Sequence, residues 1–226
     1  MVFFSFLSAL QICRRATSLL CFLRDRLIWF CCLVLFVGAI PSGPVLAEAS
    51  VSLGKTTTSD RLPLARANWP QPADKHQVFY LQRSMNRNTI VYVAEFHDDG
   101  SLKPTPIKAY WRRYEEESQT AKLKMIEKLF AYGVKSRKGN TSDSSWEIDF
   151  VALDVLKAEM RQSGPFRAAL WADINNREYK LIYGFIDLDQ SGFITKVERL
   201  HLYTFDPVSE KYATHTINVS GGDIRE

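Results

Sequence analysis

The apolar residues of this chain occur mostly in short runs or at every second position, and both patterns are typical of strands. Segment 78–92 has two apolar runs on either side of the polar residues 83–88, which predicts a β-hairpin. Trp146, Ile148 and Phe150 alternate with acidic residues, as in a half-buried strand. Further short strands are expected at 107–114, 166–171, 179–187, 193–205 and 212–219.

One segment has a helical period instead. Between residues 118 and 131, Leu123, Ile126 and Phe130 recur at helical spacing, and Gly133 follows where a helix would end. We therefore expect one amphipathic helix near 118–131. Many short strands with turns between them and a single helix predict a mainly β (α+β) fold, in which an antiparallel sheet curls into a barrel or sandwich.

The first 47 residues have the layout of a secretory signal peptide. The uncharged apolar run 27–40 follows four arginines, and small residues precede Glu48 at the expected cleavage site. The run is shorter than the ~20 residues of a membrane-spanning helix. The mature protein is therefore expected to be exported, in the periplasm or outside the cell. The alternative is an uncleaved N-terminal segment that anchors the chain. The arginines are Arg14, Arg15, Arg24 and Arg26.

Composition divides the rest of the chain into three parts. Residues 48–75 are rich in Ser, Thr and Pro, which predicts a flexible N-terminal arm. Residues 76–219 are expected to form a single β-rich domain, followed by a polar tail at 220–226. All four cysteines lie in the leader, so the mature chain is expected to use neither disulfides nor thiol chemistry. They are Cys13, Cys21, Cys31 and Cys32.

Net charge gives little indication of a partner. The chain has 29 Lys and Arg against 25 Asp and Glu, and the leader holds four of the arginines and one acid. The mature chain is thus close to neutral, at about +1. We expect no nucleic-acid partner, and contact with a membrane only through an uncleaved leader.

Polar and aromatic side chains cluster in the hairpin and in the strand that follows it. Phe79, Leu81 and Arg83 share one strand face, so an arginine extends an apolar row and must find partners. One hypothesis is a ligand pocket with Arg83 as its polar anchor. The other is a structural network that ties the hairpin turn to neighbouring strands. The candidate ligand-binding residues are Gln82, Arg83, Asn86, Asn88, Tyr110, Trp111, Arg113 and Tyr132.

Segment 187–198 matches the pattern of an EF-hand calcium loop. Asp187, Asp189, Ser191 and Glu198 stand at ligand positions, and a glycine stands at the sixth. The following residues are β-rich, however, and the alternative is a hairpin whose turn uses the same residues for backbone geometry. No other cofactor is expected, and no catalytic residue is assigned because the sequence contains no hydrolase elbow, P-loop or dinucleotide motif.

A set of short motifs runs along the chain from residue 79 to residue 203: 79–84, Asn86, 88–92, Pro106, Ile107, Tyr110, Trp111, Arg113, Tyr114, 131–134, 196–198, Leu200, Leu202 and Tyr203. In these motifs the chain resembles a bacterial family known as domain of unknown function 4833. The resemblance begins near Lys75, and it implies an exported single-domain protein without an assigned activity and without family catalytic residues to transfer. It also implies no calcium loop, so a calcium site would be peculiar to this protein.

Three functional hypotheses remain. The first is a non-enzymatic β domain that binds an unknown small molecule or an envelope component. The second is an enzyme whose site forms around Arg83 and Tyr110, and the third is calcium binding at 187–198.

Overall fold

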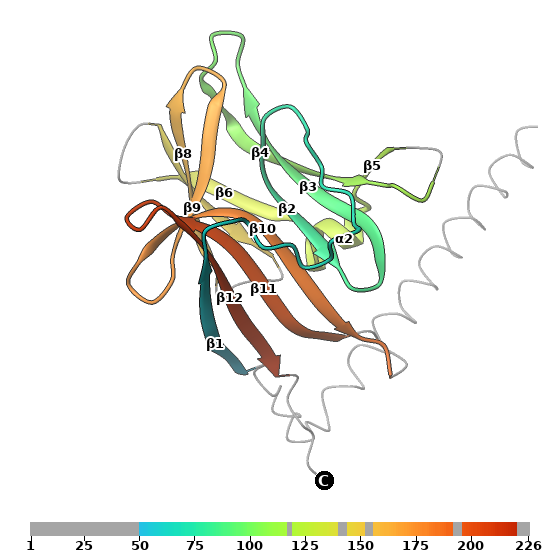
Figure 1. Ribbon diagram of the computed structural model, residues 1–226. Helices are drawn as coiled ribbons and strands as arrows, with labels where there is room; N and C mark the ends of the chain where they lie inside the picture. Colours follow the sequence, from blue (N-terminus) through green and yellow to red (C-terminus); the bar gives the residue numbers. More distant parts are fainter. Residues whose placement is uncertain (1–49, 117–118, 140–143, 152–155, 192–195, 221–226) are drawn as a thin grey trace, which may run out of the picture. The chain divides into compact units, whose positions relative to one another are not determined.

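The computed structural model describes residues 50–116, 119–139, 144–151, 156–191 and 196–220, which belong to one compact unit (Figure 1). They are mostly strand, with a single short helix, and the sheet forms a curled, open half-barrel. The prediction of a mainly β fold is confirmed. Among the described residues, no helix has the length and apolar character needed to cross a membrane. The proposed signal peptide lies outside them.

The strands pair in the order β5-β4-β3-β2-β10-β9-β8-β7-β6, and β10 also pairs with β11, which continues to β12 and β1. Their bounds are β1 (Ser50–Ser59), β2 (Gln77–Arg83), β3 (Asn86–Phe96), β4 (Leu102–Arg112), β5 (Thr120–Lys122), β6 (Val134–Lys138), β7 (Ser145–Phe150), β8 (Lys157–Gly164), β9 (Arg167–Asp173), β10 (Glu178–Asp189), β11 (Lys196–Asp206) and β12 (Lys211–Ser220); the helix is α2 (Met125–Phe130).

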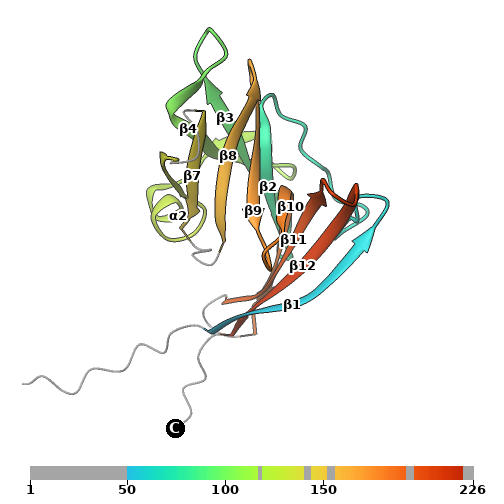
Figure 2. The same ribbon diagram turned by 90° about the vertical axis from the view of Figure 1, so that its left-hand side faces the viewer.

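Strand β10 is the branch point of the sheet. Along one edge, residues 178–180 pair antiparallel with β9 and residues 184–186 pair parallel with β2. Its other edge pairs with β11 over nearly its whole length. Figure 2 shows the consequence: β11, β12 and β1 leave the strands β7 to β9 at a steep angle.

The concave side of the curled sheet is filled by apolar side chains. Phe79, Tyr92 and Phe150 meet at its centre, with ring centroids 5.4 to 5.7 Å apart. All three are at most 3% exposed. The inside of the half-barrel is therefore a packed core, and the surfaces available to a ligand lie on its outer face and at its edges.

The predicted hairpin is present as β2 and β3, with Arg83 opposite Asn86 across the turn. The turn is also tied to β10. The backbone N–H of Ser84 donates to the carbonyl of Ile186, and its hydroxyl accepts from the N–H of Leu188, both at 2.9 Å. These bonds explain the role of Ser84, one of the polar residues in the turn.

The helix is much shorter than the pattern predicts. Its expected first turns form β5, because residues 120–122 pair with β4. Only Met125–Phe130 is helical. Leu123 is buried as expected, but Ile126 is 72% exposed, so the apolar face does not point into the core. Pairing with a neighbouring strand here overrides the local helical pattern.

Residues 50–59 differ from the expected flexible arm, because they form strand β1 and pair with β12. The irregular segment after β1 covers the outer face of the sheet. There the Tyr183 hydroxyl donates to the carbonyl of Pro63 at 2.7 Å and accepts from the N–H of Ala65 at 3.0 Å. Trp69 packs on Phe185. This contact buries a second aromatic cluster, in which Tyr80, Tyr183 and Tyr203 are stacked in parallel.

Candidate functional site

Arg83 is enclosed by aromatic rings and hydrogen-bond acceptors. Its guanidinium carbon lies 4.5 Å from the centroid of the Trp111 ring and 5.8 Å from that of Tyr132. One terminal nitrogen donates to the Tyr132 hydroxyl at 3.2 Å, and the other donates to Oδ1 of Asn86 at 3.1 Å. The two terminal nitrogens are thus engaged by the protein's own groups, whereas the buried Nε has no hydrogen-bond partner among the described residues.

The aromatic partners of Arg83 are held in turn by their neighbours. The Trp111 indole donates to Oε2 of Glu127 at 3.2 Å, and the Tyr92 hydroxyl donates to the carbonyl of Tyr132 at 3.1 Å. Burial raises the pKa of Tyr92 far above its usual value, so this hydroxyl stays a donor. Together these contacts connect β2, β3, β4 and α2, as expected of a structural network.

The other predicted residues have partners other than Arg83, although the backbone N–H of Asn88 donates to the same Oδ1 of Asn86 at 3.2 Å. Gln82 is buried and donates to the carbonyl of Pro70 at 3.1 Å, below the arm segment. Asn88 accepts from the N–H of Tyr114 at 3.0 Å. Arg113 forms an ion pair with Glu116. Tyr110 alternates with Trp111 on β4 and so faces the opposite side of the sheet. The set therefore does not converge on one pocket.

The predicted calcium residues lie at the end of a hairpin rather than between helices. Asp187 and Asp189 belong to β10, and Glu198 belongs to β11. The Asp187 carboxylate already contacts His201 at 3.0 Å and Arg199 at 3.5 Å. Ser191 donates its N–H to Asp189 in the turn at 2.8 Å. Residues 192–195 lie outside the described part, and calcium binding stays a prediction that melts with and without added calcium test.

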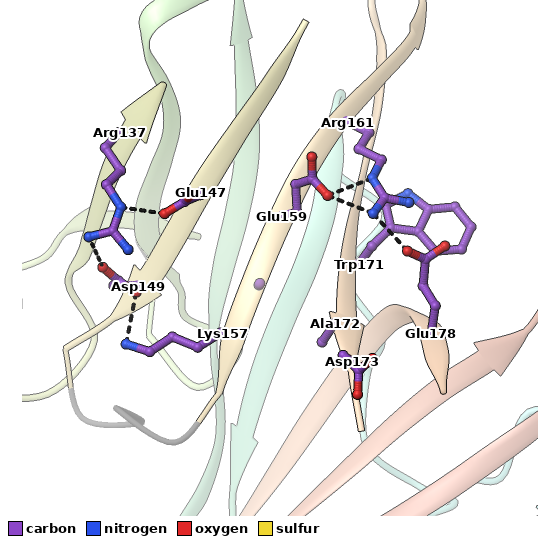
Figure 3. A pocket seen from close by; sticks show the side chains of 11 residues that line it. Arg137, Glu147, Asp149, Lys157, Glu159, Arg161, Trp171, Ala172, Asp173 and Glu178 are labelled. Atoms are coloured by element: carbon purple, nitrogen blue, oxygen red, sulfur yellow. Dashed lines mark hydrogen bonds and ion pairs between the residues drawn. The ribbon is translucent and has the colours of Figure 1, made fainter. Parts of the chain in front are cut away.

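A charged groove on the outer face of β7, β8 and β9 is a site that the sequence pattern did not single out. Its volume is about 430 Å³, and Trp171 lines it together with the strand segments at Ala158 and Ala172, whose side chains are buried in the core on the other face. Figure 3 shows most of its charged side chains in two ion-paired groups, with Asp173 outside both. In the first, Arg137 and Lys157 bind Glu147 and Asp149; in the second, Arg161 binds Glu159 and Glu178.

The strand register places two acidic residues of the groove opposite each other, and each carboxylate turns toward its own arginine (Figure 3). Glu147 on β7 lies directly opposite Glu159 on β8. Like charges at directly opposed positions destabilise a sheet. Each carboxylate has its own arginine, Arg137 or Arg161. The hydrogen bonds that Arg137 donates to Glu147, and that Arg161 donates to Glu178 and Glu159, raise the pKa of both guanidinium groups.

Carboxylates outnumber cations in the groove. Its cations are Arg137, Lys157 and Arg161, whereas Asp173 adds a fifth acid to the four already described. The side chain of Trp171 contributes an apolar wall, with the Arg161 guanidinium carbon 5.6 Å from its ring centroid. Such a groove attracts cationic or hydroxyl-rich groups and repels polyanions.

The sequence contains the signal for this groove in its charge alternation. Glu147 and Asp149 stand at every second position of one strand, and Lys157, Glu159 and Arg161 do so in the next. Which of these charged residues face each other follows only from the register of β7 and β8. In the sequence alone, segment 153–161 is ambiguous between strand and helix, so this register is not predicted.

Comparison with known proteins identifies the family. The model of the family described as "Domain of unknown function (DUF4833)" matches residues 79–215, more than half of the chain. No curated protein and no solved structure matches the chain. The match spans β2 to β12 and includes both the Arg83 network and the charged groove. The chain belongs to the DUF4833 family.

Proposed function

We propose that this protein is an exported, non-enzymatic binding domain, and that its charged groove binds a cationic, hydroxyl-rich component of the cell envelope, such as an amino-sugar polymer. The single observation that carries the proposal is the opposition of Glu147 and Glu159 across the β7–β8 pair.

This opposition is costly for a purely structural surface. Directly opposed like charges destabilise the strand pair, and exposed ion pairs return only about 0–1 kcal/mol each. The side chains of Glu147 and Glu159 are 37% and 20% exposed, so both reach the surface. A cationic group placed between the two carboxylates would relieve their repulsion. Binding of a cationic ligand would therefore account for the opposed carboxylates, whereas the stability of the fold does not.

The groove also suits a sugar chain. Carboxylates and the arginine fork can accept and donate pairs of hydrogen bonds to neighbouring hydroxyl groups. Trp171 supplies apolar surface for a sugar ring, with the Arg161 guanidinium over part of its own ring. A ligand with ring faces, hydroxyls and amines meets a complementary group at each point.

Export rests on the sequence of the leader, with its arginines, apolar run 27–40 and small residues before Glu48. N-terminal sequencing of protein isolated from its own host's envelope tests this part. Mature protein that begins at Glu48 supports export, and full-length protein in the cytosolic fraction contradicts it.

Calorimetric titration with a β-1,4-linked glucosamine tetramer tests the binding site, with the neutral N-acetylated tetramer as the matched ligand. We expect the cationic tetramer to bind more tightly. The change Glu147→Gln should weaken this binding about tenfold or more while leaving the stability equal or higher, because it removes the opposed charge. Glu198→Gln, on the exposed part of β11, is the matched control. Equal binding of both tetramers, or a loss of stability without a loss of affinity, would contradict the proposal.

A further inference from the structure

Helix α2 presents an apolar surface to solvent. Met125, Ile126 and Leu129 are 76%, 72% and 55% exposed. Residues at these spacings lie on one side of a helix, so the three side chains form one continuous apolar patch, which we call the α2 patch.

The remaining contacts of the helix hold the α2 patch outward. Leu123, just before the helix, is only 5% exposed. Glu127, on the other side of α2, accepts from the Trp111 indole at 3.2 Å and from the N–H of Lys124 at 2.7 Å. Rotating the helix to bury the patch would break both bonds and expose Leu123. The apolar surface is therefore a fixed feature of the fold.

Lysines lie next to the α2 patch. A groove of about 520 Å³ runs from α2 between β4 and β6, with Lys108, Lys128 and Lys135 in its lining and Glu95 as its single acid. Lys122 and Lys124 are exposed beside it. Apart from the pair of Lys108 with Glu95, none of these lysines has an ion pair in the described part of the chain. The other lining residues include Ile107, Leu123, Leu129 and Val134.

We propose that the α2 patch and its lysines dock onto the surface of an anionic phospholipid bilayer. Met125, Ile126 and Leu129 enter the boundary between headgroups and acyl chains, and the lysines contact lipid phosphates. Apolar side chains flanked by lysines bind such surfaces because burial and charge attraction act together. Lysine stems lie along apolar surface while the ammonium groups stay at the headgroups, which suits the mixed groove.

Charge complementarity selects a lipid surface over a second copy of the chain. Two facing α2 patches would bring their unpaired lysines together, and like charges repel. The net charge does not reveal the basic surface at α2, because the near-neutral mature chain also has an acidic groove on β7 to β9. The inference does not depend on the amino-sugar proposal, because the two surfaces share no residue.

Hydrogen exchange by mass spectrometry on the full chain tests the proposal locally. Exchange across residues 122–130 is compared with vesicles of phosphatidylcholine alone and with vesicles that also contain phosphatidylglycerol. On the anionic vesicles we expect exchange in this segment to slow roughly tenfold at about nine-tenths occupancy. The local readout reports contact by α2 even where the leader also holds the chain on the vesicle.

Two variants separate the contributions. Replacing Met125, Ile126 and Leu129 by Ser should abolish the protection, and replacing Lys108, Lys128 and Lys135 by Gln should remove its dependence on phosphatidylglycerol. The charge-matched control replaces the exposed Lys55, Lys75 and Lys180 by Gln and should keep the protection. The proposal would be overturned if anionic vesicles did not slow exchange across residues 122–130, or if both vesicle types slowed it equally. Protection that instead grows with protein concentration without vesicles would assign the patch to a second copy.

Discussion

The guanidinium of Arg83 stacks on the ring of Trp111, with 4.5 Å between the guanidinium carbon and the ring centroid. The two residues belong to β2 and β4, which are separated in the sheet by β3. The arginine therefore reaches across a strand, and its contacts to Tyr132 and Asn86 complete the tie.

Replacing Arg83 by Met should lower the free energy of unfolding by about 2–4 kcal/mol, because it removes a desolvated cation–π contact and two charge-assisted hydrogen bonds. Arg83→Lys should recover only part of this, since an ammonium cannot reproduce the fork. Urea unfolding measures both. The neighbouring exposed Arg87 is the control, and Arg87→Met should change stability by less than about 0.5 kcal/mol. An unchanged midpoint for Arg83→Met would show that Arg83 is not a structural tie.

His215 should make the protein less stable in mild acid. Its side chain is 1% exposed, between Thr56 of β1 and Thr204 of β11, and burial lowers its pKa to about 4. The unfolded chain takes up the proton near pH 6.5, before the folded protein does. The stability is thus fully present above about pH 6.5 and is lost as the pH falls toward 4, by about 2–3 kcal/mol at pH 4.5.

Urea unfolding near neutral pH and at about pH 4.5 measures this loss. The variant His215→Gln should lack most of the pH dependence, whereas the exposed His97→Gln should retain it. The same slope in both variants would assign the acid sensitivity to other groups.

Gly184 should tolerate no side chain. It lies where β10 pairs with β2, and an added Cβ would come within 2.5 Å of Leu81 Cδ2 and 3.3 Å of Leu200 Cδ1. Gly184→Ala should cost about 1–3 kcal/mol by overpacking the core. Gly164→Ala is the control, because nothing lies within 4 Å of its added Cβ, and it should be neutral or slightly stabilising. Thermal melts compare the two, and equal melting temperatures would refute the crowding at the branch.

The hydroxyl of Tyr183 should hold the segment after β1 on the sheet. Tyr183→Phe removes its bonds to Pro63 and Ala65, at a cost of about 1–2 kcal/mol, and the segment should detach more often. Limited trypsin digestion after Arg61 and Arg66 should then accelerate. Tyr212→Phe, on β12, serves as the control and should leave the digestion rate unchanged. Equal rates for the two variants would mean that apolar packing alone holds the segment.

Several elements could be predicted because their signal is local. The hairpin of β2 and β3 has two β-rich runs around a polar turn, and the alternation of Trp146, Ile148 and Phe150 gives β7 directly. The resemblance to the family is likewise carried by short motifs, each of which can be read locally, and the family match confirms it.

Other elements depend on partners that are distant in the sequence. Strand β1 has little apolar character and is stabilised by its hydrogen bonds to β12, which begins with Lys211. The predicted helix loses its first turns to β5 because β4 offers a strand edge there. In both places the backbone hydrogen bonds to a neighbouring strand decide the conformation. Local propensity does not reveal which strand edge is free to pair.

By itself, the sequence determines which side chains share a strand face, because alternation is a property of the backbone. Only the tertiary structure decides which faces meet. The register of β7 and β8 brings Glu147 opposite Glu159 and so creates the charged groove, and the contacts of Glu127 turn the apolar side of α2 toward solvent. The physical reason is that strand register and helix orientation follow from the packing of residues far apart in the chain.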